Sequence, residues 1–246
     1  MTEFLGYYTL QQVKTDITIR WVYLIPIPNC DTIGYMPITP QLLLSGYCQG
    51  IFPMAHEDGE VYWYDPDPRA ILPLDRFHVP RSLQRVVKSG RFEIRTDTAF
   101  TAVMRACAAP APGRETTWIS EDFIEAYTQL HKAGLAHCVE TWLEGELVGG
   151  LYGVSLGGLF AGESMFHWTR NASKVALVHL VERLQQGGYM LLDVQFMTPH
   201  LRRFGAIEIP RKLYKKQLAQ ALQAGVHWGL KNSRNAGSRF QAERTE

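Results

Sequence analysis

Three short runs with β-strand character follow one another in the middle of the chain: HCVETWL (137–143), LVGGLYGVSL (147–156) and LFAGESMF (159–166). Only Glu144-Gly145-Glu146 and Gly157-Gly158 separate them. Turns this short and this rich in glycine join neighbouring antiparallel strands. The stretch therefore predicts an antiparallel meander of three strands.

A helix and a further strand follow the meander. Residues 171–186 are largely apolar and end at Gly187-Gly188, which predicts a buried helix, and MLLDVQF (190–196) predicts a strand. A strand–helix–strand connection within one sheet is right-handed and makes its two strands parallel. This order of elements predicts an α/β (α+β) fold with an acetyltransferase-like (GNAT-like) mixed sheet and helices.

Further helices are predicted on both sides of this unit. Ser120 is a suitable N-cap for a helix that ends at Gly134, and residues 210–222 have an amphipathic pattern with lysines on one face. Near the start, a helix is predicted over 41–49, because proline precedes its first turn and glycine follows its last.

Two X-Pro pairs within residues 63–69 predict an extended, turning connection, since the residue before a proline avoids helical geometry. We place a domain boundary there. The expected division is a small N-terminal domain at 1–67, with a strand over 17–25, a catalytic domain at 68–230 and a polar, disordered tail at 231–246.

The 246 residues are 46% hydrophobic and carry a formal net charge of +1. This composition suits a globular protein and gives no overall field for a nucleic acid or a membrane. Residues 69–95 nevertheless hold seven basic residues against two acidic ones, which predicts a local anionic partner. No signal-peptide pattern is present, and the apolar run at 21–25 is too short to span a bilayer, so we expect a cytoplasmic protein.

Polar residues on predicted strands mark the candidate site. In a strand, alternate side chains share a face, so Asp193 and Gln195 are expected to point together, and Glu163 is expected to share a face with Leu159, Ala161 and Met165. Polar side chains within a parallel strand are costly unless they have partners. Asp193 or Gln195 taken alone indicates only a side chain that caps a local turn or bonds to the backbone. Glu163, Asp193 and Gln195 together, converging on an otherwise apolar wall, predict a functional site.

Several common chemistries are excluded. The turn before the predicted helix, residues 167–173, contains no glycine, so a pyrophosphate loop for coenzyme A is not expected. Ser164 lacks the GxSxG elbow of a nucleophilic serine. The four cysteines lie far apart and no HxH or HxxxH pair occurs, so we expect no metal and no other cofactor.

Five ordered motifs resemble the bacterial leucyl/phenylalanyl-tRNA–protein transferases: GYCQGIFP (46–53), WYDPDPRA (63–70), GESMF (162–166), NASK (171–174) and DVQ (193–195). The resemblance covers residues 37–225. It implies an enzyme that transfers leucine or phenylalanine, and methionine less well, from aminoacyl-tRNA to proteins that begin with Arg or Lys. It also implies that these proteins are thereby marked for degradation. We expect a monomer.

The resemblance also implies roles for individual residues. Asp193 and Gln195 match the catalytic pair, and Glu163 matches the acidic site residue. Residues around the donor's aminoacyl-adenosine end are Trp118, Phe160, Ser164, Met165, Met54 and Thr198, although some members carry tryptophan at position 54 and asparagine at 198. The basic segment that grips tRNA contains Arg81, Arg85 and Lys88.

An aminoacyl-tRNA is an activated ester, so the enzyme has to place a neutral amine rather than supply a strong nucleophile. About a tenth to a fifth of an α-amino group with a pKa of about 7.7–8.0 is neutral near pH 7. Our hypothesis is that the amide oxygen of Gln195 accepts a hydrogen bond from the attacking amine while Asp193 polarises that amide. Glu163 attracts the cationic acceptor or holds the donor's amino group.

Two alternatives remain open. One is an acyltransferase of the same fold with another donor or acceptor, such as glycyl- or alanyl-tRNA in cell-wall peptide synthesis. The other is a non-catalytic RNA-binding module, which Glu163, Asp193 and Gln195 argue against.

Overall fold

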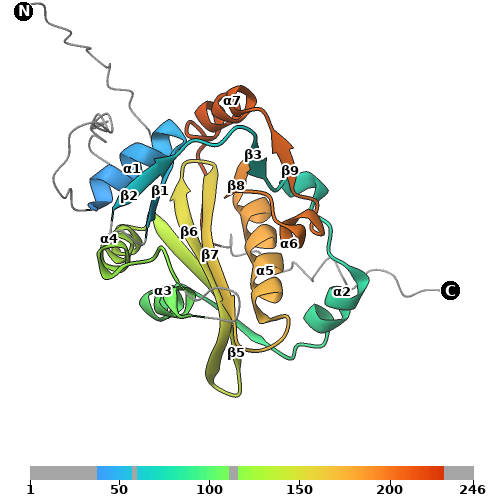
Figure 1. The fold of residues 1–246 in the computed structure, drawn as a ribbon. Helices are drawn as coiled ribbons and strands as arrows, with labels where there is room; N and C mark the ends of the chain where they lie inside the picture. The colour runs from blue at the N-terminus through green and yellow to red at the C-terminus, as the bar shows by residue number, and fades with distance from the viewer. Residues whose placement is uncertain (1–37, 57–59, 111–115, 230–246) are drawn as a thin grey trace, which may run out of the picture.

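The computed structural model describes residues 38–56, 60–110 and 116–229. Its centre is a seven-stranded mixed sheet in the order β4-β5-β6-β7-β8-β3-β9 (Figure 1). The strands of this sheet are β3 (Arg69–Ile71), β4 (Glu93–Thr96), β5 (Ala136–Leu143), β6 (Glu146–Leu156), β7 (Leu159–His167), β8 (Leu191–Gln195) and β9 (Ile207–Ile209). The predicted strand over 17–25 and the predicted tail lie outside the described residues.

The predicted meander and crossover are confirmed. Strands β5, β6 and β7 pair antiparallel, and β8 pairs parallel with β7. The connecting helix α5 (Ala172–Gly187) is buried along its apolar positions and ends at Gly188, which adopts the left-handed conformation that favours glycine. The mixed α/β architecture therefore follows from the order of elements in the middle of the chain.

Helices cover both faces of the sheet. On one face, α5 packs with Phe160 and Leu192 of the sheet in one hydrophobic core. On the other face, three helices share a second core with Ala161. These three helices are α1 (Pro40–Gln49), α3 (Phe100–Ala108) and α4 (Glu121–Lys132). The last helix, α7 (Arg211–Ala221), packs against Leu159 and Leu191.

The predicted helices have the expected ends. Helix α1 begins after Thr39, whose side chain accepts from the N–H of Leu42, and ends at left-handed Gly50. Helix α4 begins after Ser120, which accepts from Phe123. Two short helices, α2 (Arg81–Lys88) and α6 (Pro199–Arg202), and the 3-10 turn η1 (Leu74–Arg76) complete the helical elements of the described residues.

A separate antiparallel hairpin, β1 (Phe52–Ala55) and β2 (Val61–Tyr64), lies beside the large sheet (Figure 1). Its Phe52 and the α1 residue Tyr47 are buried in the same core as α3 and α4. Residues 65–68 then connect the hairpin to β3, in agreement with the extended connection predicted there. The division of the chain into domains stays a prediction.

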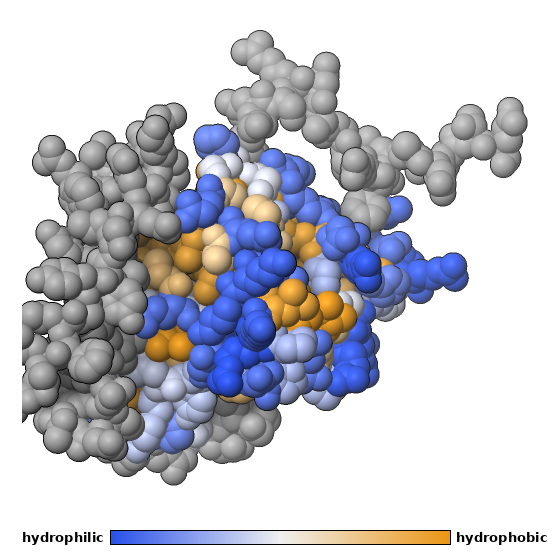
Figure 2. All heavy atoms as spheres, turned by 90° about the horizontal axis from the view of Figure 1, so that it is seen from above, coloured by the Kyte–Doolittle hydropathy of each residue, from blue (hydrophilic) through white to orange (hydrophobic). Residues whose placement is uncertain are grey.

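In the view of Figure 2, hydrophilic side chains dominate the described surface, and hydrophobic ones gather in several separate patches. Within the described ranges, every helix is too short or too polar to cross a membrane.

Candidate functional site

The large sheet opens between β7 and β8. Their parallel pairing covers only residues 159–161 and 191–193, whereas β7 continues to pair with β6 as far as His167. A cavity of about 360 Å³ lies beyond the last parallel pair. Its walls are mostly apolar side chains, with Glu163 and Gln195 among the polar ones; the lining includes Leu151, Met165, Leu177, Leu180, Leu192, Val194 and Leu201.

A β-bulge places Glu163 at this opening. The register between β6 and β7 shifts so that Gly153 faces Gly162 while Tyr152 faces Ser164, which leaves Glu163 as the extra residue. The strands approach closely here, because a Cβ on Gly153 would lie 2.3 Å from the carbonyl oxygen of Ala161. The bulge reverses the alternation along β7.

The expectation that Met165 shares a face of β7 with Leu159 and Ala161 is therefore wrong. Ala161 lies in the core with α3 and α4, whereas Met165 packs in the core with α5, on the same side as Phe160. A strict two-residue period would have placed Ala161 and Met165 together. The extra residue moved Met165 to the wall of the cavity.

Gln195 ends β8 with a φ of 65°, in the left-handed region that non-glycine residues rarely adopt. Its side-chain Nε2 donates a 2.9 Å hydrogen bond to Oε1 of Glu163. The side chain of Asp193 contacts a different set of groups. The left-handed backbone at Gln195 interrupts the regular alternation of an extended strand, and the expectation that the two side chains point together stays a prediction.

Asp193 is 1% exposed and forms a buried ion pair. Arg69 of β3 donates to both carboxylate oxygens, from Nε at 2.9 Å and Nη2 at 2.6 Å, and the hydroxyl of Tyr214 donates at 2.8 Å. The backbone N–H of Gln195 also donates to Asp193 at 2.9 Å. Asp193 thus fixes the backbone of Gln195, and its predicted action on the side-chain amide is wrong, because Glu163 accepts from that amide.

Arg69 belongs to the basic segment that the sequence assigned to an anionic partner, but it is 1% exposed and lies inside the protein. Its guanidinium lies 4.7 Å from the ring centre of Phe52 and 4.5 Å from that of Tyr214, and it donates to the carbonyl of Gly50. It therefore joins α1, the hairpin and α7 to the carboxylate on β8.

Glu163 has only uncharged partners. Besides Gln195, the hydroxyl of Tyr127 donates to its Oε2 at 3.3 Å, and Tyr127 is hydrogen-bonded to the hydroxyl of Tyr47. Burial raises the pKa of Glu163 to about 7. The negative charge of Asp193 raises this pKa further, whereas the hydrogen bonds from Tyr47, Gln195 and Tyr127 lower it. The site therefore contains a carboxyl group that can gain or lose a proton near neutral pH.

The other predicted site residues divide into three groups. Ser164, Met165 and Thr198 line the cavity. Trp118, Met54 and Phe160 are not among its lining residues: the first two pack against the core with α3 and α4, and Phe160 is fully buried and stacks with Trp228. The three basic residues predicted to grip tRNA, Arg81, Arg85 and Lys88, are exposed on α2.

Sequence reasoning missed Arg69, Tyr47 and Tyr127 as partners of the two carboxylates. A usable signal existed for Arg69, because a buried aspartate requires a cation or several donors. Nothing in the local pattern distinguishes Tyr47 or Tyr127 from ordinary core residues of amphipathic helices.

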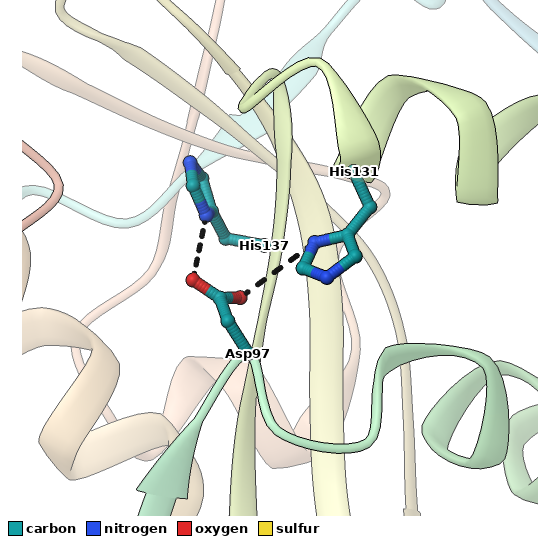
Figure 3. A group of neighbouring side chains, drawn as sticks. All are labelled: Asp97, His131 and His137. Carbon is teal, nitrogen blue, oxygen red and sulfur yellow. Dashed lines mark hydrogen bonds and ion pairs between the residues drawn. The ribbon is translucent and has the colours of Figure 1, made fainter.

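A second group of titratable side chains, Asp97, His131 and His137, lies near the start of the meander (Figure 3). Their potential metal ligands lie within 4.8 Å of one another. The Asp97 carboxylate already accepts from Nδ1 of His137 at 2.8 Å, and the remaining donors are the N–H of Cys138 and the indole of Trp228. Nδ1 of His131 is within 2.8 Å of the Ala136 carbonyl, so hydrogen bonds explain the cluster without an ion.

The fold and the cavity define a class: a mixed α/β protein with a largely apolar cavity beside a carboxyl–carboxamide pair, at the point where its sheet opens. Family models narrow this class. The model for leucyl/phenylalanyl-tRNA protein transferase matches residues 71–219, and the model for the N-terminal domain of the same proteins matches residues 36–67.

Curated relatives agree with the family models. The leucyl/phenylalanyl-tRNA–protein transferase of Herpetosiphon aurantiacus is 65% identical over 77% of this chain and 97% of that protein. Those of Paramagnetospirillum magneticum and Gloeobacter violaceus are 54% and 55% identical, over 80% and 75% of this chain and 95% and 94% of theirs. The chain belongs to the leucyl/phenylalanyl-tRNA–protein transferase family, a family of aminoacyltransferases.

Among solved structures, L-PGS from Bacillus licheniformis matches with a TM-score of 0.41 and 14% identity, over 64% of this chain and 65% of that one. This likeness is too weak to support a conclusion.

Proposed function

We propose that this protein transfers leucine or phenylalanine, and methionine less well, from aminoacyl-tRNA to acceptor proteins that begin with Arg or Lys. A peptide bond forms, and the acceptor is marked for degradation. The supporting observation is the apolar cavity that ends at the Glu163–Gln195 pair. The proposal includes an acetyltransferase-like sheet, a monomer and a cytoplasmic location.

The donor's side chain enters the cavity. Leu177, Leu180 and Leu192 give it a wide apolar wall, and Met165 adds a flexible side chain that can adapt to leucine, methionine or a phenyl ring. β-Branched side chains are wider next to the ester and fit less well. Since one misplaced methyl group discriminates by only about 1–3 kcal/mol, some transfer of methionine is expected.

The reaction joins the acceptor's α-amino nitrogen to the ester carbonyl carbon, and the 3′-terminal ribose oxygen of tRNA leaves with the bonding electron pair. The amine loses one proton and the ribose oxygen gains one. Placing two bound reactants can contribute about 7–11 kcal/mol, whereas neutralising the amine near pH 7 costs only about 1 kcal/mol. Positioning is therefore the larger requirement.

Gln195 and Glu163 meet this requirement together. Because Nε2 of Gln195 donates to Glu163, the amide oxygen of Gln195 is the group left to accept from the attacking amine. The Glu163 carboxylate makes that oxygen a better acceptor and, with a pKa of about 7, can take up the amine's proton. Asp193 acts through the backbone of Gln195, as a positioning residue.

The tRNA body is proposed to lie along α2. Arg81, Arg85 and Lys88 are exposed on this helix, and α2 contacts α5 on the face of the sheet where the cavity is lined by Leu177 and Leu180. A phosphate backbone held there can deliver its aminoacylated end to the cavity.

The test offers radiolabelled leucyl-tRNA and two peptides that differ only at their first residue, Arg or Ala. Label should enter the Arg peptide and not the Ala peptide. Phenylalanyl-tRNA should also be used, and isoleucyl- or valyl-tRNA should be used at least about tenfold less well. Transfer from glycyl- or alanyl-tRNA instead, or RNA binding without any transfer, would refute the proposal.

A further inference from the structure

The proposed reaction leaves several polar side chains of the cavity wall unused: Tyr152, Ser164, Thr198 and His200. His200, in α6, lines the cavity wall, and its Nε2 is buried without a hydrogen-bond partner among the described residues. A buried imidazole nitrogen without a partner costs free energy, so it is expected to bind something that the isolated chain does not supply.

The surroundings of His200 are positively charged. Burial is the largest cause that lowers the pKa of His200. The nearby charges of Lys174, His167 and Arg203 lower it further. Neither Lys174 nor Arg203 has an ion pair with a carboxylate in the described part of the chain. Lys174 lies in the first turn of α5, which holds no acidic residue to offset the positive end of the helix dipole. The missing partner is therefore an anion.

This cationic group lies on a continuous path from α2. The ring of His200 lies 5.1 Å from that of Phe204, and Phe204 stacks on Phe77 with ring centres 5.7 Å apart. The N–H of His78 donates to the carbonyl of Phe204 at 3.0 Å, and α2 begins three residues later. Figure 1 shows α2, α5 and α6 on the same side of the sheet.

We propose that His200, Lys174 and Arg203 bind the 5′-phosphate of the donor's terminal nucleotide, so that the aminoacyl group enters the cavity in a fixed orientation. This inference rests on the proposed function. The neutral His200 donates from Nε2 to a phosphate oxygen, while Lys174 and Arg203 supply charge. The same charge repels the cationic first residue of an acceptor, which directs the acceptor to the other side of the Glu163–Gln195 pair.

The test compares two small donors: 2′(3′)-O-leucyl-adenosine and the same ester of adenosine 5′-monophosphate, each with a peptide that begins with Arg. The wild-type enzyme should use the phosphorylated donor with at least about tenfold higher kcat/KM, since a charged hydrogen bond of this kind contributes a factor of that order. His200→Ala should bring the ratio of the two kcat/KM values close to one, and the exposed variant Arg203→Met should lower it about threefold.

Lys132→Met is the matched control, because Lys132 is an exposed cation on α4, on the opposite face of the sheet. It should leave the ratio at the wild-type value. Thermal melting of each variant checks folding, and Arg203→Met tests the proposal even where His200→Ala fails to fold. A wild-type ratio near one, or a ratio that neither variant changes, would overturn the phosphate site. Absence of transfer by the wild type from either donor would instead refute the proposed function.

Discussion

Asp193 and Glu163 lie on neighbouring strands of one sheet, yet they have opposite surroundings. Asp193 is bound on both oxygens by a guanidinium and is almost completely buried. Glu163 is bound by an amide and by tyrosine hydroxyls, and it faces a cavity. Asp193 has a compensating charge beside it, whereas Glu163 has only neutral donors and can exchange a proton near neutral pH. Two acidic residues on neighbouring strands can thus have different roles, one structural and one chemical.

Removing Arg69 should have the largest effect. Arg69→Met leaves Asp193 charged and buried, and the loss of one partner of a buried ion pair costs about 3–5 kcal/mol. Chemical denaturation should show this loss in the free energy of unfolding. Arg211→Met is the control, since its ion pairs are exposed with distances of 3.9 Å and should contribute less than about 1 kcal/mol. An unchanged unfolding midpoint for Arg69→Met would refute the role given to this ion pair.

The proton on Glu163 should appear in the pH dependence of stability. Its pKa is raised from 4.5 to about 7 in the folded protein. Below pH 4.5, Glu163 is protonated in both the folded and the unfolded chain. Between pH 4.5 and 7 it is protonated only in the folded chain, so the free energy of unfolding falls as the pH rises. This loss is complete above about pH 7. Relative to Glu163→Gln, which cannot titrate, the wild type should lose up to about 3 kcal/mol across this window. Parallel curves for the two proteins would refute the raised pKa.

Transfer itself should be sensitive to Glu163. In Glu163→Gln the carboxamide of Gln195 loses its charged acceptor, and the proton of the amine loses its nearby base. We expect the single-turnover rate to fall about 100-fold, a typical contribution of a positioned acid–base group. Glu125→Gln, an exposed change on α4, is the control. A Glu163→Gln rate within threefold of wild type would assign Glu163 to structure alone.

The smallest expected effect is a shift in the pH–rate profile of Tyr127→Phe, which distinguishes titration of Glu163 from titration of the acceptor amine. Tyr127 donates to the Glu163 carboxylate and lowers its pKa, so Tyr127→Phe should raise that pKa by about one unit. The rising limb of the pH–rate profile should move up with it, while the limb due to the acceptor amine stays in place. Tyr189→Phe, whose hydroxyl is bonded to Ser155, should move neither. A fixed profile in Tyr127→Phe would show that Glu163 does not control the rate.

The parts of the fold that the sequence predicted have local signals. Short glycine turns predict the meander, and apolar periodicity together with residues typical of helix ends predicts α1, α4, α5 and α7. Strands β3 and β9 have three residues each and join the sheet through pairing with segments far away in the chain, so no local period announces them. The open edge between β7 and β8 depends on those same distant pairings.

The site was predicted by residue type more accurately than by geometry. Glu163, Asp193 and Gln195 do converge, but a bulge at Glu163 and a left-handed Gln195 change which groups touch. The strand glycines Gly153 and Gly162 are the local signal for the bulge, whereas glutamate and glutamine do not themselves favour a bulge or a positive φ. Their conformations are set by the surrounding packing.

The backbone at Gln195 has a consequence for how this protein can be altered. A glycine at 195 would relax the left-handed geometry, a gain of about 1 kcal/mol, but would delete the amide that meets Glu163. Laboratory selection for heat resistance alone should therefore favour variants at 195 that selection for activity removes. A position where the two selections disagree identifies a functional residue without any knowledge of its substrate.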